Sequence, residues 1–218
     1  RKYWRDGFLA PIDVMSEAEA LALRLRIEGV EAEQGPIHYL RSPHLIMMAA
    51  DEMVHMTPVL DAIEDIIGPD ILLWSSIFII KEPGDRKFVS WHQDLTYWGL
   101  EPAEVASVWL ALSPATRESG AMRMIPGSHR RGQVEHTTSE NDENVLLHGQ
   151  HASVEIDESH AVDIVLKPGQ MSLHHGLTLH ASHPNVSSDR RIGYNMNTMP
   201  PHVRQVKAAE DSAMLLRG

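Results

Sequence analysis

The chain has 218 residues and 43% hydrophobic residues, which suits a single globular domain with a full core. Its formal net charge is −11 with scattered basic residues, and this argues against a nucleic-acid partner, which needs clustered lysine and arginine. The absence of cysteine excludes disulfides, zinc fingers and cysteine-ligated clusters, and it predicts a cytoplasmic protein.

Helical patterns dominate the first part of the chain, residues 1–68. Residues 16–28 predict a helix that begins at a serine cap, followed three positions later by a glutamate that completes a capping box. Residues 57–68 predict another, with Thr57 as cap and Gly68 at its end. A weaker helical pattern covers residues 45–54. We expect residues 1–68 to be mostly helical support for the rest of the domain.

After Pro69 the pattern changes to about seven short strands separated by turn residues. The longest apolar run, "ILLWSSIFII", has ten residues and two serines, which predicts a buried strand and no membrane partner. Residues 131–161 are polar and irregular, as in a long loop or lid. We therefore expect one domain over residues 1–218, mainly β, with a jelly-roll barrel at 69–200 and helices packed outside.

Histidines supply the first signal for chemistry. With 14 histidines and no cysteine, any transition metal must be held by imidazole and carboxylate groups. His92 and Asp94 are two residues apart, so a strand would point both to one face. A third ligand can come from the strand-like segment "MSLHHGLTLHASH", in which His174 and His175 compete with His180. Two histidines and one carboxylate form the ligand set of non-haem Fe(II) oxygenases, although zinc hydrolases also use it.

An arginine eleven residues after His180 is the second signal. Arg191 follows the turn-rich stretch "SHPNVSSD", so the two residues would lie across a hairpin. A guanidinium near such a metal site is shaped to grip a carboxylate with two hydrogen bonds. A dicarboxylate such as 2-oxoglutarate could chelate the metal through its keto-acid end and meet Arg191 at its far end. Arg190 would point to the opposite face and is expected in a solvated turn.

The ordered stretches "WHQDLTYWGL", "IPGSHR" and "HASHPNVSSDRR" resemble the phytanoyl-CoA dioxygenase family of iron- and 2-oxoglutarate-dependent oxygenases, and the resemblance runs from about Tyr3 to near the end. It implies a double-stranded β-helix fold of the cupin kind. It also implies that Fe(II) is held by His92, Asp94 and His180, and that O₂ is the second substrate. The implied cosubstrate-binding residues are Arg191, Ser182, Trp109 and Ile77. An acid at position 94 implies hydroxylation, because halogenating relatives carry a small residue there.

Several other residues are candidates for the pocket. His175, Asn195 and Tyr97 are candidate substrate contacts, and Trp91 and Trp98 are candidate walls. A family lysine that reaches 2-oxoglutarate has no clear counterpart, and His38 or Arg41 lies near its expected place. Strand alternation does not place three further candidate cations, which are Lys81, Arg123 and Arg217.

The expected function is hydroxylation of an unactivated C–H bond in a small metabolite, with release of succinate and CO₂. A small polar or anionic substrate such as an aminophosphonate is favoured, and a fatty acyl or terpenoid substrate is the alternative within the family. Two other classes stay open: a zinc or manganese lyase, isomerase or hydrolase on the same barrel, and a non-catalytic ligand-binding barrel. The sequence does not decide the oligomeric state.

Overall fold

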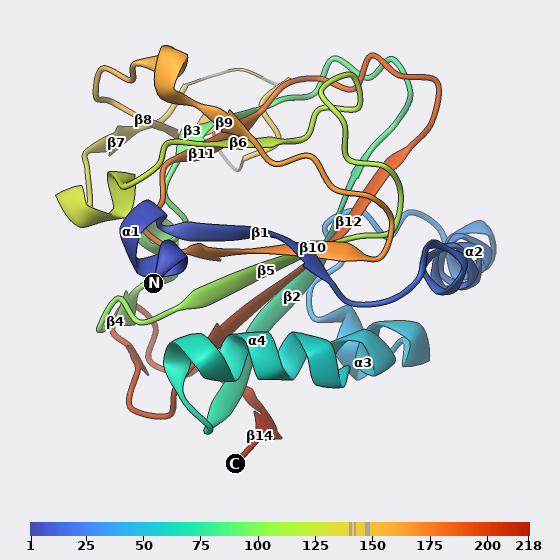
Figure 1. The fold of residues 1–218 in the computed structure, drawn as a ribbon, viewed down its shortest axis with the longest axis horizontal. Coiled ribbons are helices and arrows are strands. Elements are labelled where there is room, and N and C mark those ends of the chain that lie inside the picture. Colours follow the sequence, from blue (N-terminus) through green and yellow to red (C-terminus); the bar gives the residue numbers. More distant parts are fainter. Residues whose placement is uncertain (140, 142, 147–148) are drawn as a thin grey trace.

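The computed structural model describes residues 1–139, 141, 143–146 and 149–218, and two facing antiparallel sheets dominate it (Figure 1). The larger sheet has the order β1 (Phe8–Asp13), β10 (Gln170–His175), β5 (Ala106–Ala111), β12 (Arg191–Met199), β2 (Ile71–Lys81), β14 (Met214–Arg217). The smaller sheet has the order β3 (Val89–His92), β11 (His180–Ser182), β6 (Met122–Met124), β9 (Val162–Asp163). This arrangement is the predicted jelly roll.

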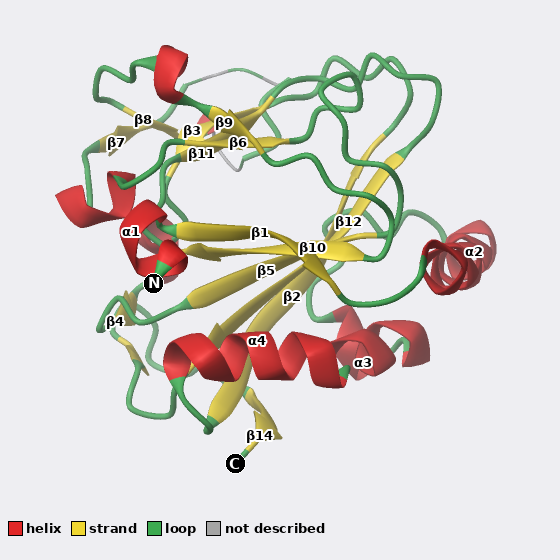
Figure 2. Ribbon diagram, in the orientation of Figure 1, coloured by secondary structure: helices red, strands yellow, loops and turns green. Residues whose placement is uncertain are grey.

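The helices α3 (Met48–Val54) and α4 (Thr57–Ile67) cover the side of the larger sheet that faces away from the smaller one (Figure 2). The other helices are α1 (Lys2–Asp6), α2 (Glu17–Gln34) and the short α5 (Leu95–Trp98). The capping box that begins α2 is present, as predicted, but α4 is capped by Met56 rather than Thr57 and has no side-chain cap. Within the described residues, no helix is long and apolar enough to cross a membrane.

Short elements complete the chain. In the part of the chain that the structure describes, these include the 3₁₀ turns η1 (Pro43–Leu45), η2 (Ser128–Arg131) and η4 (Glu158–His160). Two are strand pairs, β4 (Leu100–Glu101) with β13 (Arg204–Gln205) and β7 (His136–Thr137) with β8 (His151–Ala152). The segment 131–161, expected to be irregular, therefore contains a strand pair and a 3₁₀ turn. Four of its residues, Glu140, Asp142, Leu147 and His148, lie outside the described part, so its role as a lid stays a prediction.

The barrel extends beyond the predicted range of 69–200 at both ends. β1 comes from the segment that was expected to be helical and pairs with β10, and β14 pairs with β2. Both strands lack clean alternation, because β1 contains Pro11 and an irregularity between Leu9 and Ile12, and β14 has one between Leu215 and Arg217. A strand with a broken register does not produce the two-residue period that identifies strands in a sequence.

The two faces of the larger sheet differ in chemistry. Its outer face is apolar and packs under α3 and α4, where Phe78 of β2 stacks on Tyr194 of β12 with ring centroids 4.6 Å apart. Its inner face carries charged and amide groups, because Arg191 and Asn195 alternate with Ile192 and Tyr194 along β12. The fold thus separates a stabilising core outside the barrel from a polar interior.

Candidate metal centre and anion pocket

Three candidate ligands meet inside the barrel between the ends of β3 and β11. His180 lies directly opposite His92 in the strand pairing, and Asp94 follows β3 by two residues. Oδ1 of Asp94 lies 3.4 Å from Nε2 of His92 and 3.7 Å from Nε2 of His180. One ligand atom from each residue lies within 4.8 Å of the others, as a shared ion requires. The predicted trio is therefore brought together from positions 86 residues apart, counted from Asp94 to His180.

Hydrogen bonds fix both imidazoles with Nε2 directed at the carboxylate. Nδ1 of His92 lies 2.9 Å from the carbonyl oxygen of Ser90, and Nδ1 of His180 lies 2.9 Å from that of Thr178. A carbonyl oxygen only accepts, so each Nδ1 carries the proton and each neutral ring presents a lone pair at Nε2. Two lone pairs then face a carboxylate oxygen, and only a cation satisfies three acceptors at once. The donor set thus fits a divalent transition metal.

Electrostatics keep the trio in the form that binds metal. Burial alone would raise the pKa of Asp94, but the surrounding imidazoles, of which His180 acts most strongly, hold it well below its usual range. Burial lowers the pKa of His180 to about 3, with the neighbouring His92 acting in the same direction. Asp94 is therefore ionised and His180 neutral at pH 7, which is what metal ligation needs.

The other carboxylate oxygen of Asp94 is held from the larger sheet. Nε2 of His174 on β10 lies 3.2 Å from Oδ2, and the hydroxyl of Ser107 on β5 donates to the same atom at 3.3 Å. His174 and Ser107 are direct partners across these two strands. His174, which the sequence offered as a competing ligand, and Ser107, which the sequence did not single out, together orient the carboxylate so that Oδ1 faces the two rings.

His175 lies away from the three candidate ligands, so its role toward substrate stays a prediction. Its Nδ1 accepts from the amide of Leu177 at 3.1 Å, and its ring lies 5.3 Å from that of His129, on the face of β10 opposite His174. Strand alternation allows only one of two adjacent histidines to face the barrel interior, and it is His174. The sequence placed two histidines side by side without giving the parity of the strand.

Arg191 is buried on the inner face of β12, with 1% of its surface exposed. Its guanidinium lies 5.2 Å from the ring centre of Trp109, and Nη1 donates to the carbonyl of Gly120 at 2.7 Å. Nε has no partner. Gly193 permits this stacking, since a Cβ there would lie 1.9 Å from the Trp109 ring. Burial lowers the pKa of Arg191 to about 10, so it remains charged at pH 7.

A second buried basic side chain stands opposite the first. Lys81 of β2 is paired in register with Arg191 and is also 1% exposed. Its Nζ donates to Oγ of Ser182 at 2.7 Å and to the carbonyl of His183. Within the described residues, neither side chain has a carboxylate within ion-pair distance. An arginine and a lysine buried together without an acid form a pocket that is suited to an anion.

The other two candidate cations are engaged outside the barrel. Arg123 pairs with Glu158 at 2.7 Å and with Asp163 at 3.6 Å. Arg217 pairs with Asp61 at 2.8 Å and with Glu64 at 2.6 Å, near the surface. Among the three candidates, Lys81 alone reaches the interior.

Further polar atoms on the inner face lack partners. Ile77 of β2 and Trp109 of β5 flank Asn195 of β12 in register, and Trp109 is 2% exposed. The side-chain oxygens of Asn195, Asn197 and Ser172 are buried without a hydrogen bond. Buried polar groups are normally paired, so this group of orphans indicates space for a polar ligand.

Two aromatic residues after β3 make ring contacts of their own. The Tyr97 hydroxyl is buried without a partner, and its ring meets His136 edge-on at 5.5 Å. Trp98 packs on Trp74 at 5.2 Å. These ring contacts do not involve the metal-site histidines, so a role for Tyr97 toward substrate stays a prediction.

The segment expected to replace the family lysine contributes Tyr39 instead. His38 accepts a hydrogen bond from the amide of Ile80 at 3.0 Å, and Arg41 is exposed. Tyr39 between them has a φ of 59°, an uncommon conformation for a residue with a side chain. Burial raises its pKa to about 12, and the charges of Arg191 and Asp94 both act on it. The phenol is thus near enough to feel both Arg191 of the anion pocket and the metal-site carboxylate, and residue type alone gave no sign of this.

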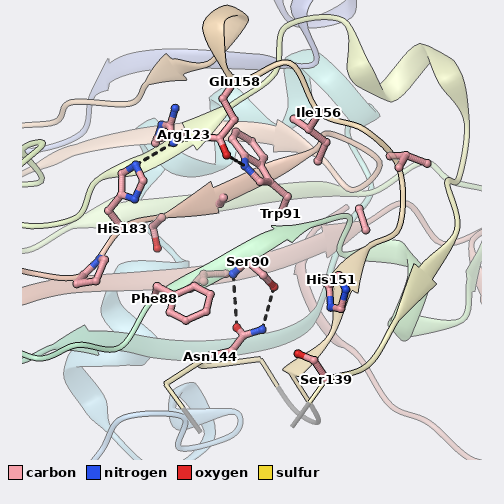
Figure 3. A pocket seen from close by; sticks show the side chains of 16 residues that line it. Phe88, Ser90, Trp91, Arg123, Ser139, Asn144, His151, Ile156, Glu158 and His183 are labelled. Carbon is pink, nitrogen blue, oxygen red and sulfur yellow. Dashed lines mark hydrogen bonds and ion pairs between the residues drawn. The ribbon is translucent and has the colours of Figure 1, made fainter. Parts of the chain in front are cut away.

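A separate cavity of about 690 Å³ lies on the outer face of the smaller sheet (Figure 3). Trp91, Arg123 and Ala181 line it, and each of them is adjacent in its strand to an inward-facing residue. Nε1 of Trp91 donates to Glu158 at 3.1 Å, and Arg123 donates to Nε2 of His183 at 2.8 Å. Trp91 therefore belongs to this outer cavity and not to the wall of the metal site, because it alternates with His92.

Comparison with known proteins places this site in a family. The phytanoyl-CoA dioxygenase family model matches residues 3–193. The chain belongs to the phytanoyl-CoA dioxygenase family. Within curated proteins, it is 30% identical over 160 residues to a probable alpha-ketoglutarate-dependent hypophosphite dioxygenase of Stutzerimonas stutzeri, covering 71% of this chain and 56% of that protein. It is 24% identical over 231 residues to L-proline trans-4-hydroxylase of Streptomyces griseoviridis, covering 92% and 86%.

Solved structures of non-heme monooxygenases also match this chain over its whole length. The non-heme monooxygenase ThoJ matches with a TM-score of 0.87 and 34% identity, covering 100% of this chain and 82% of that one. A nickel complex of ThoJ matches with a TM-score of 0.81. The chain spans little more than half the length of the hypophosphite dioxygenase, at 56%, and 43% of a rice phytanoyl-CoA dioxygenase.

Metal addition tests the three-acceptor arrangement. Fe(II) or Ni(II) should raise the unfolding temperature of the wild-type protein, because binding to the folded state alone stabilises it. The variant Asp94→Asn should lose this increase, because an amide cannot supply the central charge. Calorimetry with and without metal measures the effect. His175→Gln is the matched control and should keep the full increase. An equal increase in Asp94→Asn would refute the assignment of the site.

Proposed function

We propose that this protein is an Fe(II)- and 2-oxoglutarate-dependent dioxygenase. In this proposal, His92, Asp94 and His180 hold the iron, and the far carboxylate of 2-oxoglutarate lies at Arg191 and Ser182, beside Trp109 and Ile77. Three protein ligands leave open positions on a six-coordinate metal for cosubstrate and O₂. The bound metal would supply oxygen activation coupled to decarboxylation of 2-oxoglutarate to succinate.

One observation carries the proposal. A pocket that contains Arg191 and Lys81 but, among the described residues, no acidic side chain lies next to a metal site whose three side chains offer only lone pairs, and both lie along the inner face of β11. His180 and Ser182 share the inner face of β11, and Ser182 contacts Lys81, the neighbour of Arg191. Two residues of a strand span about 7 Å, comparable with an extended five-carbon diacid and its bond to a metal. A hydrolytic or lyase metal site has no need of a buried, unpaired arginine at this distance.

The residues around the open positions have specific tasks. Backbone carbonyls hold the proton on Nδ1 of both ligating histidines, and His174 with Ser107 orients Asp94. Arg191, fixed over Trp109, would hold the cosubstrate so that its keto-acid end reaches the metal. The hydroxylation outcome follows from Asp94, which occupies the position that a halide would need.

We further propose that the substrate is a small polar or anionic metabolite. The unpaired oxygens of Ser172, Asn195 and Asn197 on the inner face favour a polar ligand over an acyl chain. Two relatives, by their names, act on hypophosphite and on L-proline, which are small and polar. The alternative of a fatty acyl or terpenoid substrate would need an apolar channel, and the aminophosphonate class is one case of the favoured type.

Two adjacent arginines give a matched test of the cosubstrate site. Arg191→Gln should weaken 2-oxoglutarate binding by about 100-fold, because truncating one partner of a buried charge pair costs about 2–5 kcal/mol. Arg190→Gln should leave it unchanged, since Arg190 pairs with Glu28, Glu31 and Glu82 on the outside. Anaerobic titration of the Fe(II)-loaded proteins measures both affinities. Equal affinities in the two variants would contradict the assignment of Arg191.

Succinate release measures which substrate class couples to the reaction. We expect L-proline-like amino acids, aminophosphonates or hypophosphite to stimulate Fe(II)- and O₂-dependent succinate release well above the uncoupled rate, and fatty acyl-CoA esters to leave it unchanged. Stimulation by acyl-CoA alone would overturn the polar-substrate proposal while leaving the cosubstrate site intact. Activity without O₂ and without succinate would overturn the dioxygenase proposal itself.

A further inference from the structure

Lys81 links the two sheets at the far end of the candidate cosubstrate site. It is the last residue of β2, and its Nζ donates across the barrel to Oγ of Ser182 on β11 and to the carbonyl of His183. Its own carbonyl accepts from Nδ2 of Asn185 at 3.0 Å, which fixes the following turn. A lysine held by neutral oxygens at 1% exposure is far from the solvated end of a strand that its sequence position suggests.

The charges around Lys81 do not compensate it. Arg191 lies directly opposite on β12, and like charges in direct cross-strand pairs are destabilising. Asp85, in the turn after β2, acts on Lys81 only weakly and forms its ion pair with Lys87 at 3.8 Å. Glu82 is turned outward to Arg190, and the His183 ring meets Arg123 on the outer face. His38 and Tyr39, from the segment beside β2, are the remaining titratable neighbours, and neither carries a negative charge at pH 7.

We propose that Lys81 is the second cation for the far carboxylate of the cosubstrate, and that it takes up a proton when this carboxylate binds. The proposal rests on the proposed function, because it assumes that 2-oxoglutarate occupies the pocket between Lys81 and Arg191. Two permanent cations would be unbalanced both without a ligand and beside a single carboxylate. A lysine that is neutral without the carboxylate and protonated beside it adds a positive charge only when the negative charge is present. Arg191 provides the permanent charge and Lys81 the adjustable one.

The direction of the pH dependence follows from the burial of Lys81. Burial, with Arg191 adding to it, lowers the pKa of Lys81 to about 6, so the free protein holds it mostly neutral at pH 7.5. A bound carboxylate raises that pKa, so binding takes up a proton between pH 6 and the new, higher pKa. Affinity for 2-oxoglutarate should therefore fall as the pH rises through this window, by up to about tenfold per pH unit.

Titration calorimetry measures the proton directly. Fe(II)-loaded protein is titrated anaerobically with 2-oxoglutarate at pH 7.5 in buffers that differ in ionisation enthalpy, and the slope of observed against buffer enthalpy counts the protons taken up. We expect close to one proton for wild type. Lys81→Met should take up none and bind 2-oxoglutarate about 10- to 100-fold more weakly.

Three comparisons separate this role from a structural one. Lys81→Arg, which keeps a permanent charge, should retain most of the affinity and lose the proton uptake. Lys87→Met, which removes a half-exposed lysine nearby, should behave as wild type in both respects. Without cosubstrate, Lys81→Met should unfold at the same or a higher temperature than wild type, because it replaces a buried amine, whose removal from water is costly, with an apolar side chain.

The outcomes are distinct. Unchanged affinity or unchanged proton uptake in Lys81→Met overturns the proposal for Lys81 and leaves the proposed function standing. A strongly lowered unfolding temperature of unliganded Lys81→Met also overturns the proposal for Lys81, because the main role of this residue would then be to stabilise the fold by linking the two sheets. Failure of the Fe(II)-loaded wild-type protein to bind 2-oxoglutarate overturns the proposed function, and the proposal for Lys81 with it.

Discussion

Charge buried without a partner is the constraint on which this site depends. The barrel interior holds a carboxylate facing two imidazole lone pairs and, close by, an arginine facing a lysine. Each arrangement raises the free energy of the folded chain by itself, because hydrogen-bond acceptors face each other in the first and basic groups face each other in the second, at low exposure. A metal ion relieves the first arrangement and an anion relieves the second. The interior therefore favours binding of a metal ion and an anion, neither of which the chain itself supplies.

The cost of this interior is offset on the other side of the larger sheet. The outer face packs Phe78, Tyr194 and their neighbours beneath α3 and α4 into a continuous apolar cluster, which supplies the hydrophobic stabilisation of the fold. The same strands carry both faces, so β12 presents Tyr194 to the core and Arg191 to the site. Strand alternation keeps stabilisation and chemistry apart within one element.

Local spacing in the sequence was sufficient for part of the site. His180 and Ser182 lie two residues apart on β11, so their shared face follows from the strand period. His92 and Asp94 are also two residues apart, but β3 ends at His92 and Asp94 has the helical backbone conformation that begins α5, so the spacing pointed to the right pair although the strand argument does not apply to Asp94. It was harder to predict which of two adjacent residues faces the barrel interior. Arg191 lies inside the barrel and Arg190 outside it, but the hairpin from which this was argued does not form, because β11 pairs with β3 and β6 whereas β12 pairs with β2 and β5. No local marker separated His174 from His175. Trp91 was misplaced because it is next to a ligand in the sequence and therefore points away from it.

Contacts between strands that are distant in the chain could not be predicted from the sequence. The pairing of Lys81 with Arg191 and the bond of His174 to Asp94 depend on register across the barrel, which no local pattern encodes. Tyr39 comes from a segment whose backbone conformation at φ 59° no propensity predicts. The strands β1 and β14 were missed because irregular register removes their period. Residue types and their spacings were thus enough to predict the candidate ligands and the cosubstrate arginine. The residues that hold them in place became apparent only from the fold.

The central claim is that iron and 2-oxoglutarate occupy one connected site in this barrel. The most direct measurement is the visible absorption spectrum of the Fe(II)-loaded protein, recorded without oxygen as 2-oxoglutarate is added. We expect a weak charge-transfer band that grows with 2-oxoglutarate and saturates at one equivalent per chain. Bound iron with no spectral change at saturating 2-oxoglutarate would contradict the claim.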